Sequence, residues 1–377
     1  MRVDLNAPIK DGVVTDDTRI EAILPTVQHL MEKKAKITLI SHLGRPDGKK
    51  NPKYSLMPVA EKLAELLGKE VLFPDDCIGD GVRKLQQEQM AGQLLLLENL
   101  RFHADEENCD MDFAKKLKGN HDIYISDAFG ALHRAHASTS ALPSLFENRG
   151  IGLLIQKELE FLYPLIKSPV RPYSVILGGA KISDKLKIME SLLKKVDRLF
   201  IGGAMVFTFL KAKGFQIGNS LFEENMVSRA KRIMDEASER KISIFFPKDF
   251  RIAKSMKDHS ENRLTDSIQI PEGYMALDVG PKTVAHFTEF LQGSKTVFWN
   301  GPMGWFEQPP FDYGTVELAK NMAAMDAIKI IGGGDSAAAV AQAHLSDRMN
   351  HISTGGGATL EFLENPELPG LKALLVS

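Results

Sequence analysis

Short apolar runs alternate with helix-periodic stretches along the first half of the chain. A short apolar run predicts a buried strand, and apolar residues three and four positions apart predict a helix. The predicted strands are 36–41, 70–73, 94–98 and 122–126. The predicted helices are 19–33, 56–67, 80–89 and 112–117, and Pro25 is expected to kink or split the first of them. Strands that alternate with helices predict a parallel sheet covered on both faces.

The second half repeats this alternation with a clearer pattern. Its predicted strands are 174–177, 199–201, 296–299, 328–331 and 351–353. Its predicted helices are 183–196, 222–240, 316–325 and 337–344. Between the halves, the apolar turns of 151–166 predict a buried helix, and the prolines of 167–173 mark a break. This break favours two successive domains over one closed barrel.

We therefore predict an α/β fold with two doubly wound, Rossmann-like parallel-sheet domains, joined by a helix and separated by a cleft. The predicted boundaries are 1–155 for the N-terminal domain, 156–171 for the interdomain helix and hinge, and 172–362 for the C-terminal domain. The last stretch, 363–377, contains Pro366, Pro369 and Gly370 and predicts a tail that returns toward the N-terminal domain.

Composition narrows the classes of partner. The 377 residues include 47 Lys and Arg and 49 Asp and Glu, so 47 − 49 gives a formal net charge of −2. Without a basic excess, neither a nucleic acid nor an acidic membrane is expected as a partner, and an anion site must be local. Cys77 and Cys109 form no CxxC motif, which argues against a disulfide framework and for the cytoplasm. No apolar stretch approaches the ~20 residues that span a bilayer, and no signal core follows Met1.

Glycine pairs or triplets follow four predicted strands of the second half. They are 178–179, 202–203, 332–334 and 355–357. Glycine lets the backbone approach a ligand closely, and the free N–H groups of a following helix then face an anion. The carboxyl ends of parallel strands meet at one edge, so this pattern predicts a phosphate-binding site. The alternative is a set of unrelated tight turns.

The second half lacks the G-x-x-x-x-G-K-[ST] motif of Walker-type sites. The stretch Gly332-x-Gly334-x-x-Ala337 fits a loose dinucleotide fingerprint, but no acid for a ribose stands near Thr354. Lys181 and Lys185 are four residues apart at the start of a predicted helix, which would place them on one face. Helix dipoles disfavour cations there, so an anion between the two lysines is expected. Solvated surface lysines are the alternative.

Polar and basic residues follow the predicted strands of the first half. They are Asp4, Asn6, His42, Arg45, Arg101, Asp127, His133, Arg134 and His136, with Arg19 at the start of the first helix. Several cations at one sheet edge are costly unless a polyanion binds there. The alternative is a set of unrelated surface cations, each capping a loop or paired with a carboxylate. Two anion sites on separate domains suggest phosphoryl transfer between their ligands.

At this point the chain resembles the phosphoglycerate kinases over nearly its whole length. The stretches that carry the resemblance are RVDLNAP (2–8), SHLGRP (41–46), LLLENLRF (95–102), SDAFGALHRAH (126–136), LGGAKISDKL (177–186), IGGAMVFTFLKAKG (201–214), FWNGPMGWFE (298–307), IIGGGDS (330–336) and STGGGATLEFLE (353–364). The resemblance implies reversible, Mg²⁺-dependent transfer of the ATP γ-phosphoryl group to 3-phosphoglycerate, which gives ADP and 1,3-bisphosphoglycerate. It also implies a glycolytic, hinge-bending enzyme, expected to be a monomer.

The resemblance assigns each site residue a role. The 3-phosphoglycerate site would comprise Asp4, Leu5, Asn6, Arg19, His42, Leu43, Gly44, Arg45, Arg101, His133 and Arg134. The nucleotide site would comprise Lys181, Lys185, Gly202, Gly203, Ala276, Asn300, Pro302, Glu307, Gly333, Gly334, Asp335 and Ser336, with Asp335 on Mg²⁺. The catalytic groups would be Arg19, Lys181, Gly333 and Gly356. No general base is expected, because the attacking carboxylate is already ionised near neutral pH.

The chain departs from the family pattern at a few positions. Met1 directly precedes the RVDLNAP motif, where relatives usually carry a short segment that completes the first strand. Trp305 and Ala276 stand near the expected base site, where a small apolar residue and a glycine are usual. Ser336 replaces the commoner threonine, and Leu132 replaces alanine. The alternatives are an NAD-dependent dehydrogenase and a non-catalytic metabolite-binding relative.

Overall fold

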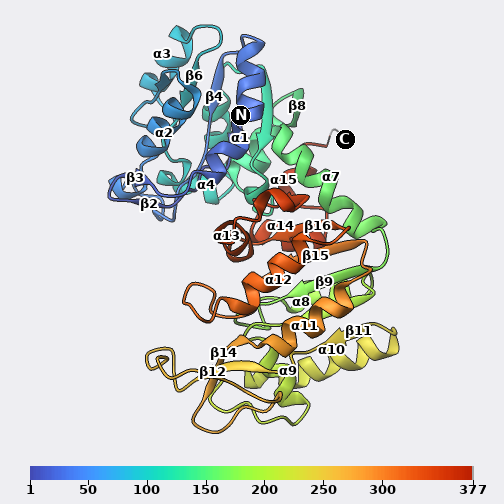
Figure 1. Cartoon of the computed structure of the whole chain (residues 1–377). Coiled ribbons are helices and arrows are strands. Elements are labelled where there is room, and N and C mark those ends of the chain that lie inside the picture. The colour runs from blue at the N-terminus through green and yellow to red at the C-terminus, as the bar shows by residue number, and fades with distance from the viewer. Residues whose placement is uncertain (376–377) are drawn as a thin grey trace. The chain divides into compact units, whose positions relative to one another are not determined.

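The computed structural model describes residues 1–375 and divides the chain into two compact units. Unit 1 comprises Met1–Glu160 together with the chain from Asn365 onward, and unit 2 comprises Phe161–Glu364. Each unit is an α/β structure whose parallel strands are flanked by helices (Figure 1). Helix α7 (Leu153–Lys167) begins in unit 1 and ends in unit 2.

Two short parallel sheets form the centre of unit 1. The first has the order β1 (Arg2–Val3), β7 (Ile123–Asp127), β8 (Asn148–Ile151), and the second β4 (Ile37–Leu39), β6 (Leu94–Leu96), β5 (Val71–Leu72). A parallel bridge between Arg2 and Ile40 joins the two sheets, and the Val3 amide donates to the Ile40 carbonyl at 3.0 Å. Strand β1 therefore lies between β7 and β4, and the residues that follow it reach the edge of both sheets.

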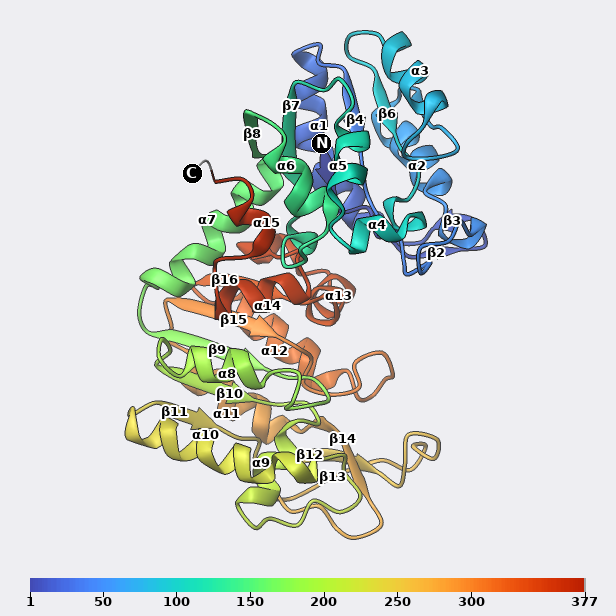
Figure 2. The ribbon, with the colours of Figure 1, turned by 180° about the vertical axis from the view of Figure 1, so that it is seen from behind.

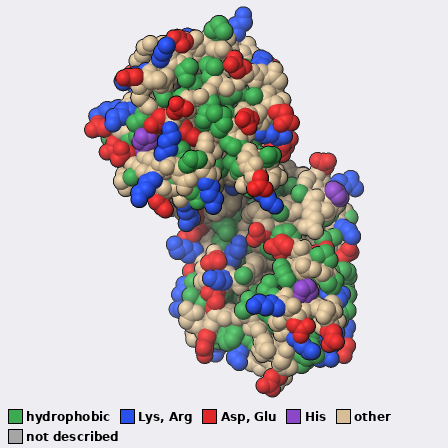
Figure 3. Space-filling view, turned by 90° about the vertical axis from the view of Figure 1, so that its left-hand side faces the viewer, with side chains coloured by type: hydrophobic (Ala, Val, Ile, Leu, Met, Phe, Trp, Pro, Cys, Tyr) green, Lys and Arg blue, Asp and Glu red, His purple; other side chains and the backbone are tan. Residues whose placement is uncertain are grey.

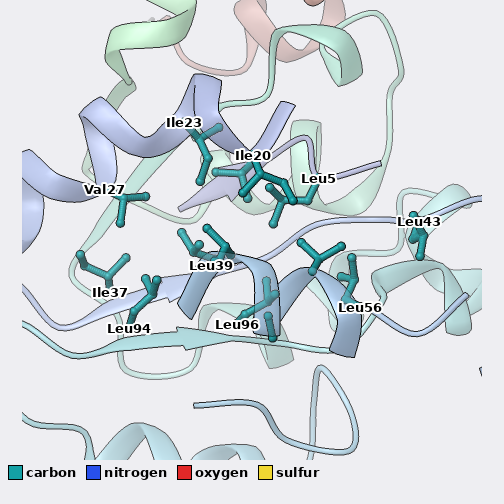
Figure 4. Close-up of a cluster of buried hydrophobic side chains, with 14 of the residues drawn as sticks. Leu5, Ile20, Ile23, Val27, Ile37, Leu39, Leu43, Leu56, Leu94 and Leu96 are labelled. Carbon is teal, nitrogen blue, oxygen red and sulfur yellow. The ribbon is translucent and has the colours of Figure 1, made fainter. Parts of the chain in front are cut away.

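Helices cover both faces of the unit 1 sheets. The remaining elements of unit 1 are β2 (Ile9–Lys10), β3 (Val13–Val14), α1 (Thr18–Glu32), η1 (Pro52–Tyr54), α2 (Met57–Leu67), α3 (Asp80–Glu88), η2 (Leu100–Phe102), α4 (Ala104–Glu107), α5 (Met111–Lys118), η3 (Phe129–Ala131), η4 (Ala137–Ala141), α6 (Leu142–Ser144) and α15 (Pro369–Lys372). Leu94 and Leu96 face a core shared with α1 and α2, where Ile20, Ile23 and Val27 converge (Figure 4). Leu95 and Leu97 alternate to the opposite core.

Unit 2 contains a six-stranded parallel sheet. Its order is β11 (Ser243–Phe245), β10 (Arg198–Ile201), β9 (Tyr173–Leu177), β15 (Thr296–Asn300), β16 (Ile328–Gly332), β17 (His351–Ile352). Helices α11 (Pro281–Leu291) and α12 (Tyr313–Ala323) cover one face, and α8 (Leu186–Leu192) and α14 (Gly357–Glu364) cover the other (Figure 2). The other helices of unit 2 are α9 (Val206–Ala212), η5 (Glu224–Met226), α10 (Val227–Glu239), α13 (Gly334–Gln342) and η6 (Ser346–Arg348).

Several predicted elements need correction. Helix α1 runs through Pro25 without a break, and the predicted helix 183–196 forms α8 only from Leu186 to Leu192. The predicted buried helix 151–166 is α7, whose exposed Leu153 and Tyr163 show that one face is open. Unit 2 also has an antiparallel sheet that the sequence pattern did not predict, with the order β13 (Arg263–Leu264), β12 (Phe250–Ala253), β14 (Met275–Val279).

The surface of both units is mixed in charge. On the face drawn in Figure 3, basic and acidic side chains are interspersed, in keeping with the small net charge. Across residues 1–375, the helices are all too short or too polar to cross a membrane.

Candidate functional site

The polar residues that follow β1 are held by an ion pair at the start of α1. A guanidinium nitrogen of Arg19 donates to Asp4 Oδ2. Burial alone would raise the pKa of Asp4, but the positive charges of Arg19 and Arg2 and the hydrogen bond from the Asn6 amide outweigh it and lower the pKa. Asp4 is therefore an ionised anchor for Arg19. Gly130 leaves the room for this pair, because a Cβ there would stand 2.4 Å from Asp4 Oδ2.

His42 is a buried, neutral imidazole. Burial lowers its pKa well below the ordinary value, and the neighbouring arginines add to this effect against the attraction of Asp4. Arg2 Nη2 lies 3.1 Å from His42 Nδ1. A guanidinium can only donate, so Nδ1 accepts and the proton resides on Nε2. His42 thus offers an N–H donor without adding charge.

Arg101 is a buried cation with unused hydrogen-bond donors. Its side chain is 4% exposed, Nη1 donates to the Gly44 carbonyl at 2.8 Å, and Nε lies 3.2 Å from Glu107 Oε1. Its Nη2 has no hydrogen-bond partner within residues 1–375, and neither has Nε, whose contact with Glu107 is an ion pair without hydrogen-bond geometry. The Gly44 amide in turn donates to Asn6 Oδ1 at 2.9 Å. A buried guanidinium donor without a partner costs free energy that a bound anion recovers.

A buried polar network supports this cluster, and the sequence analysis missed it. Arg2 Nε donates to Ser138 Oγ at 2.8 Å, and Ser138 Oγ donates to Glu106 Oε1 at 2.6 Å. Burial raises the pKa of Glu106. The sequence contained a sign of this network, because side chains alternate between the two faces of a strand. Val3 and Leu5 enter the apolar core, so Arg2 must lie on the other face with Asp4.

The remaining candidate residues of unit 1 differ in burial and in their contacts. Leu5 and Leu43 are core side chains, so only their backbone groups can serve a ligand. Arg134 lies near enough for its charge to lower the pKa of Arg101 and His42. Arg45 is exposed and forms no ion pair within the described chain. His133 is half-buried. The structure thus joins Asp4, Asn6, Arg19, His42, Gly44 and Arg101 by contacts or charge, and Arg134 by charge.

We expect the free energy of unfolding to decrease as the pH is lowered, because of His136. Burial and the nearby arginines lower its pKa from 6.5 to about 4 in the folded chain. The unfolded chain therefore binds a proton first as the pH falls below about 6.5, and stability declines until about pH 4. Urea unfolding between pH 7 and pH 5 should show a loss on the order of 1–2 kcal/mol from this residue.

The His136→Gln variant should flatten part of that slope, and the exposed His29→Gln serves as the matched control. An unchanged slope in His136→Gln would contradict the assignment.

In unit 2 the glycine turns lie where the strand order reverses. The chain proceeds from β9 outward to β10 and β11, and from β15 outward to β16 and β17. Ligands of open α/β sheets bind at such a switch point, outside the carboxyl ends of the strands. The Gly178 amide donates to the Asn300 carbonyl at 3.0 Å across this point. Gly203 has a φ of +63°, and a Cβ there would stand 2.4 Å from the Gly179 nitrogen.

Lys185, Asn300 and Gly333 are joined beside this turn. Lys185 Nζ donates to Asn300 Oδ1, and Asn300 Nδ2 donates to the Gly332 carbonyl at 2.7 Å. Gly333 has a φ of +91° and precedes α13, and a Cβ there would meet Asn300 Nδ2 at 2.7 Å. Burial lowers the pKa of Lys185, against the attraction of Asp335 and Asp184.

The expectation that Lys181 and Lys185 share a helix face is wrong. Helix α8 begins at Leu186, so Lys185 is the residue before the helix and Lys181 lies in the preceding loop. Lys181 is exposed, and its charge is among the influences on the pKa of Glu223. The ammonium group of Lys181 is therefore free to move toward a ligand, whereas that of Lys185 is held by Asn300.

The first turn of α13 presents Asp335 and Ser336. Asp335 is exposed. Ser336 is buried, and its Oγ accepts a hydrogen bond from the Gly301 amide at 2.5 Å. The hydroxyl thus ties α13 to the turn after β15. Gly334 opens this helix, whose N-terminal amides suit a phosphate.

A cavity of about 240 Å³ opens beside the glycine turns. Its lining includes Gly179, Ala180, Gly203, Ala204, Phe207, Leu221, Met256, Ala276, Pro302, Trp305, Glu307 and Asp335. Apolar walls with a few polar groups suit a flat heterocycle joined to a polar tail. Gly202 lies behind the wall, because a Cβ there would meet Met303 Sδ at 2.4 Å. Gly356, with a φ of +54°, lies in the turn before α14 and does not line this cavity.

The Trp305 side chain belongs to an aromatic group at this cavity. It stacks on Phe311 with ring centroids 6.0 Å apart, and the ring of His259 stands edge-on to it at 5.5 Å. The indole is thus packed against Phe311 and His259 at this cavity.

Comparisons with known proteins agree with the sequence motifs. The family model described as phosphoglycerate kinase matches residues 1–366. The chain is 50% identical over 376 residues to the phosphoglycerate kinase of Anaeromyxobacter dehalogenans (strain 2CP-C), covering 99% of this chain and 95% of that protein. It is 47% identical over 377 residues to the phosphoglycerate kinase of Clostridioides difficile (strain 630), covering 99% and 94%.

Solved structures agree as well. The phosphoglycerate kinase of Coxiella burnetii matches with a TM-score of 0.88 at 38% identity, covering 99% of this chain and 94% of that chain. The enzyme of Pyrococcus horikoshii OT3 matches with a TM-score of 0.87 at 34% identity, with the same coverage.

Proposed function

The chain belongs to the phosphoglycerate kinase family, and we propose that its two units divide the two substrates of that reaction between them. The reaction is the reversible transfer of the ATP γ-phosphoryl group to the carboxylate of 3-phosphoglycerate. In the proposal, unit 1 binds 3-phosphoglycerate and unit 2 binds the nucleotide. The dehydrogenase alternative is not favoured, because the family match extends over residues 1–366.

The buried Nη2 of Arg101 is the observation that best supports the unit 1 assignment. It is a cationic donor with no hydrogen-bond partner in residues 1–375, and the charge of Arg101 acts on the neutral His42. A carboxylate and a phosphate on a short carbon chain supply the negative charge that this cluster lacks. His42 Nε2 donates to the ligand. Asn6 holds the Gly44 amide, and the Gly44 carbonyl holds the Arg101 guanidinium. Arg45, His133 and Arg134 complete the proposed contacts.

Catalysis in this proposal is electrostatic. The nucleophile is a carboxylate, ionised near neutral pH, so no group has to remove a proton. The obstacle is repulsion between two anions, which grows as water leaves the site. Arg19 offsets the charge of the carboxylate, and Lys181 offsets that of the transferring phosphoryl group. The amides of Gly333 and Gly356 offer further donors to it.

In unit 2 the nucleotide phosphates are proposed to lie against Lys185, Gly334 and Ser336, and the base and ribose in the cavity lined by Ala276, Pro302 and Glu307. Gly202 leaves room for Met303 in the wall of that cavity. Asn300 donates to the Gly332 carbonyl and so holds the turn before α13. The exposed carboxylate of Asp335 fits Mg²⁺, which prefers one or two carboxylates together with substrate phosphates. When bound, Mg²⁺ would neutralise phosphate charge.

Two further properties are part of the proposal. Both cysteines are free thiols, which suits a reducing cytoplasm. Each unit contains its own ligand groups, so we propose a monomer.

A crossed binding experiment tests the division of substrates. We expect Arg101→Met to raise the Kd of 3-phosphoglycerate by about 10- to 150-fold, because a charge-assisted hydrogen bond is lost, and to leave the Kd of MgADP unchanged. Glu307→Gln should weaken only the nucleotide, by roughly tenfold. Isothermal titration of the full chain measures both constants.

Circular dichroism and the conservative Arg101→Lys variant control for folding. Equal loss of both ligands in a folded Arg101 variant would contradict the proposal.

A further inference from the structure

Unit 1 holds a cluster of metal-ligating side chains outside the two substrate sites. A carboxylate oxygen of Asp76, the Sγ of Cys77 and a ring nitrogen of His103 all lie within 4.8 Å of one another. Asp76 and Cys77 lie in the loop between β5 and α3, and His103 lies between η2 and α4. Donors from two separate segments of the chain therefore converge on one point.

The donor types favour a particular class of ion. Thiolate, imidazole and carboxylate are the ligands of Zn²⁺ and of its neighbours in the first transition row. Mg²⁺ and Ca²⁺ prefer oxygen ligands throughout. The cluster is therefore chemically distinct from the Mg²⁺ that accompanies a nucleotide.

The contacts within the cluster are compatible with an ion at its centre. His103 Nε2 and Asp76 Oδ1 share a hydrogen bond of 2.7 Å. Two such donors about 2.0–2.1 Å from a tetrahedral ion stand roughly 3.3 Å apart. The two side chains would therefore separate by about half an ångström when an ion replaces the proton between them. Both are partly exposed, so they have the freedom to do so.

Burial gives the cluster an inner and an outer side. Cys77 is 1% exposed and packs in the core with Leu97 and Phe113, whereas the side chains of Asp76 and His103 are 47% and 26% exposed. Three protein ligands with solvent on the outer side leave a fourth position for water. Cysteine binds such an ion as a thiolate, so binding at Cys77 has to release the thiol proton.

We propose that Asp76, Cys77 and His103 form a second divalent-metal site, of the zinc class, on unit 1. The competing explanation is that His103 and Asp76 form only a hydrogen-bonded ion pair and that Cys77 is only a core residue. In that explanation the Cys77 sulfur binds no metal, so the test must detect a bond between the sulfur and a metal ion.

Cobalt titration of the full chain tests this. The protein is treated with a chelator, transferred to nucleotide-free buffer and titrated with Co²⁺, whose bond to a thiolate produces a charge-transfer band. We expect the wild type to bind one Co²⁺ with this band and to release it on addition of Zn²⁺. Cys77→Ser should lose the band, and His103→Gln should weaken binding by more than roughly tenfold. The matched control is Cys109→Ser, which removes the other cysteine and should retain the band.

The outcomes separate the two explanations. Absence of the band in wild type, its survival in Cys77→Ser, or its loss in Cys109→Ser would overturn the proposal. Thermal unfolding without metal reports whether each variant is folded. If Cys77→Ser does not fold, the partly exposed His103→Gln decides, and wild-type affinity in that variant would overturn the site.

Discussion

Replacing Arg19 with alanine should lower kcat by about 10²- to 10³-fold while the KM for 3-phosphoglycerate changes less than about tenfold. Arg19 is one-third exposed and held by Asp4, so its guanidinium is already in place before a ligand arrives. In the proposal it opposes the repulsion between carboxylate and phosphoryl group, which is largest in the transition state. A coupled assay with 3-phosphoglycerate and MgATP gives both constants.

Two variants control this measurement. Arg83→Ala removes an exposed arginine of α3 that pairs with Asp80, and it should behave as the wild type. Arg19→Lys keeps the charge but loses the forked donor geometry, so it should recover only part of kcat. If Arg19→Ala weakens substrate binding while turnover is unchanged, the residue has a binding role and not the proposed one.

Replacing Gly203 with alanine should damage both the fold and the proposed nucleotide site of unit 2. The φ of +63° costs any other residue about 1–2 kcal/mol, and the new Cβ would stand 2.4 Å from the Gly179 nitrogen and 2.5 Å from its carbonyl oxygen. These are backbone atoms that cannot turn aside, so the loop must move. We expect the free energy of unfolding to fall by more than about 2 kcal/mol and the Kd of MgADP to rise at least about tenfold.

Gly214 provides a matched comparison. Its φ is +81°, but a Cβ there would meet nothing within 4 Å. Gly214→Ala therefore carries the backbone strain without the collision, and it should cost about 1–2 kcal/mol with nucleotide affinity unchanged. Urea unfolding and calorimetric titration of both variants separate the effect of the Cβ contact from that of the backbone strain. Equal losses in the two variants would mean that the close approach of Gly203 to Gly179 does not matter.

Regular alternation made the parallel sheets predictable. The run Leu94–Leu97 is apolar at every position because its odd and even residues enter different cores. The glycine turns were also predictable from local sequence. Gly203 and Gly333 occupy backbone conformations that other residues adopt only with strain. Each of these features depends on a few neighbouring residues.

Contacts between distant segments were not predictable in this way. Arg2 meets Ser138 across more than a hundred residues, and Lys185 meets Asn300 across a similar span. Pro25 was expected to interrupt a helix, but Ile23 and Val27 pack in the core on either side of it. That burial offsets the roughly 3 kcal/mol cost of the proline. The antiparallel sheet of unit 2 was missed because the short β13 and a long loop separate β12 from β14.

The chain leaves unit 1 along α7 and contributes to it again only after Glu364. The Gly370 amide donates to the Leu132 carbonyl at 2.9 Å, and a Cβ at Gly370 would collide with Leu132. During translation, the ribosome therefore synthesises all of unit 2 before it releases the segment that covers Leu132. A nascent chain must hold the first 160 residues in an incomplete state throughout that interval, while unit 2 can already assemble from contiguous sequence.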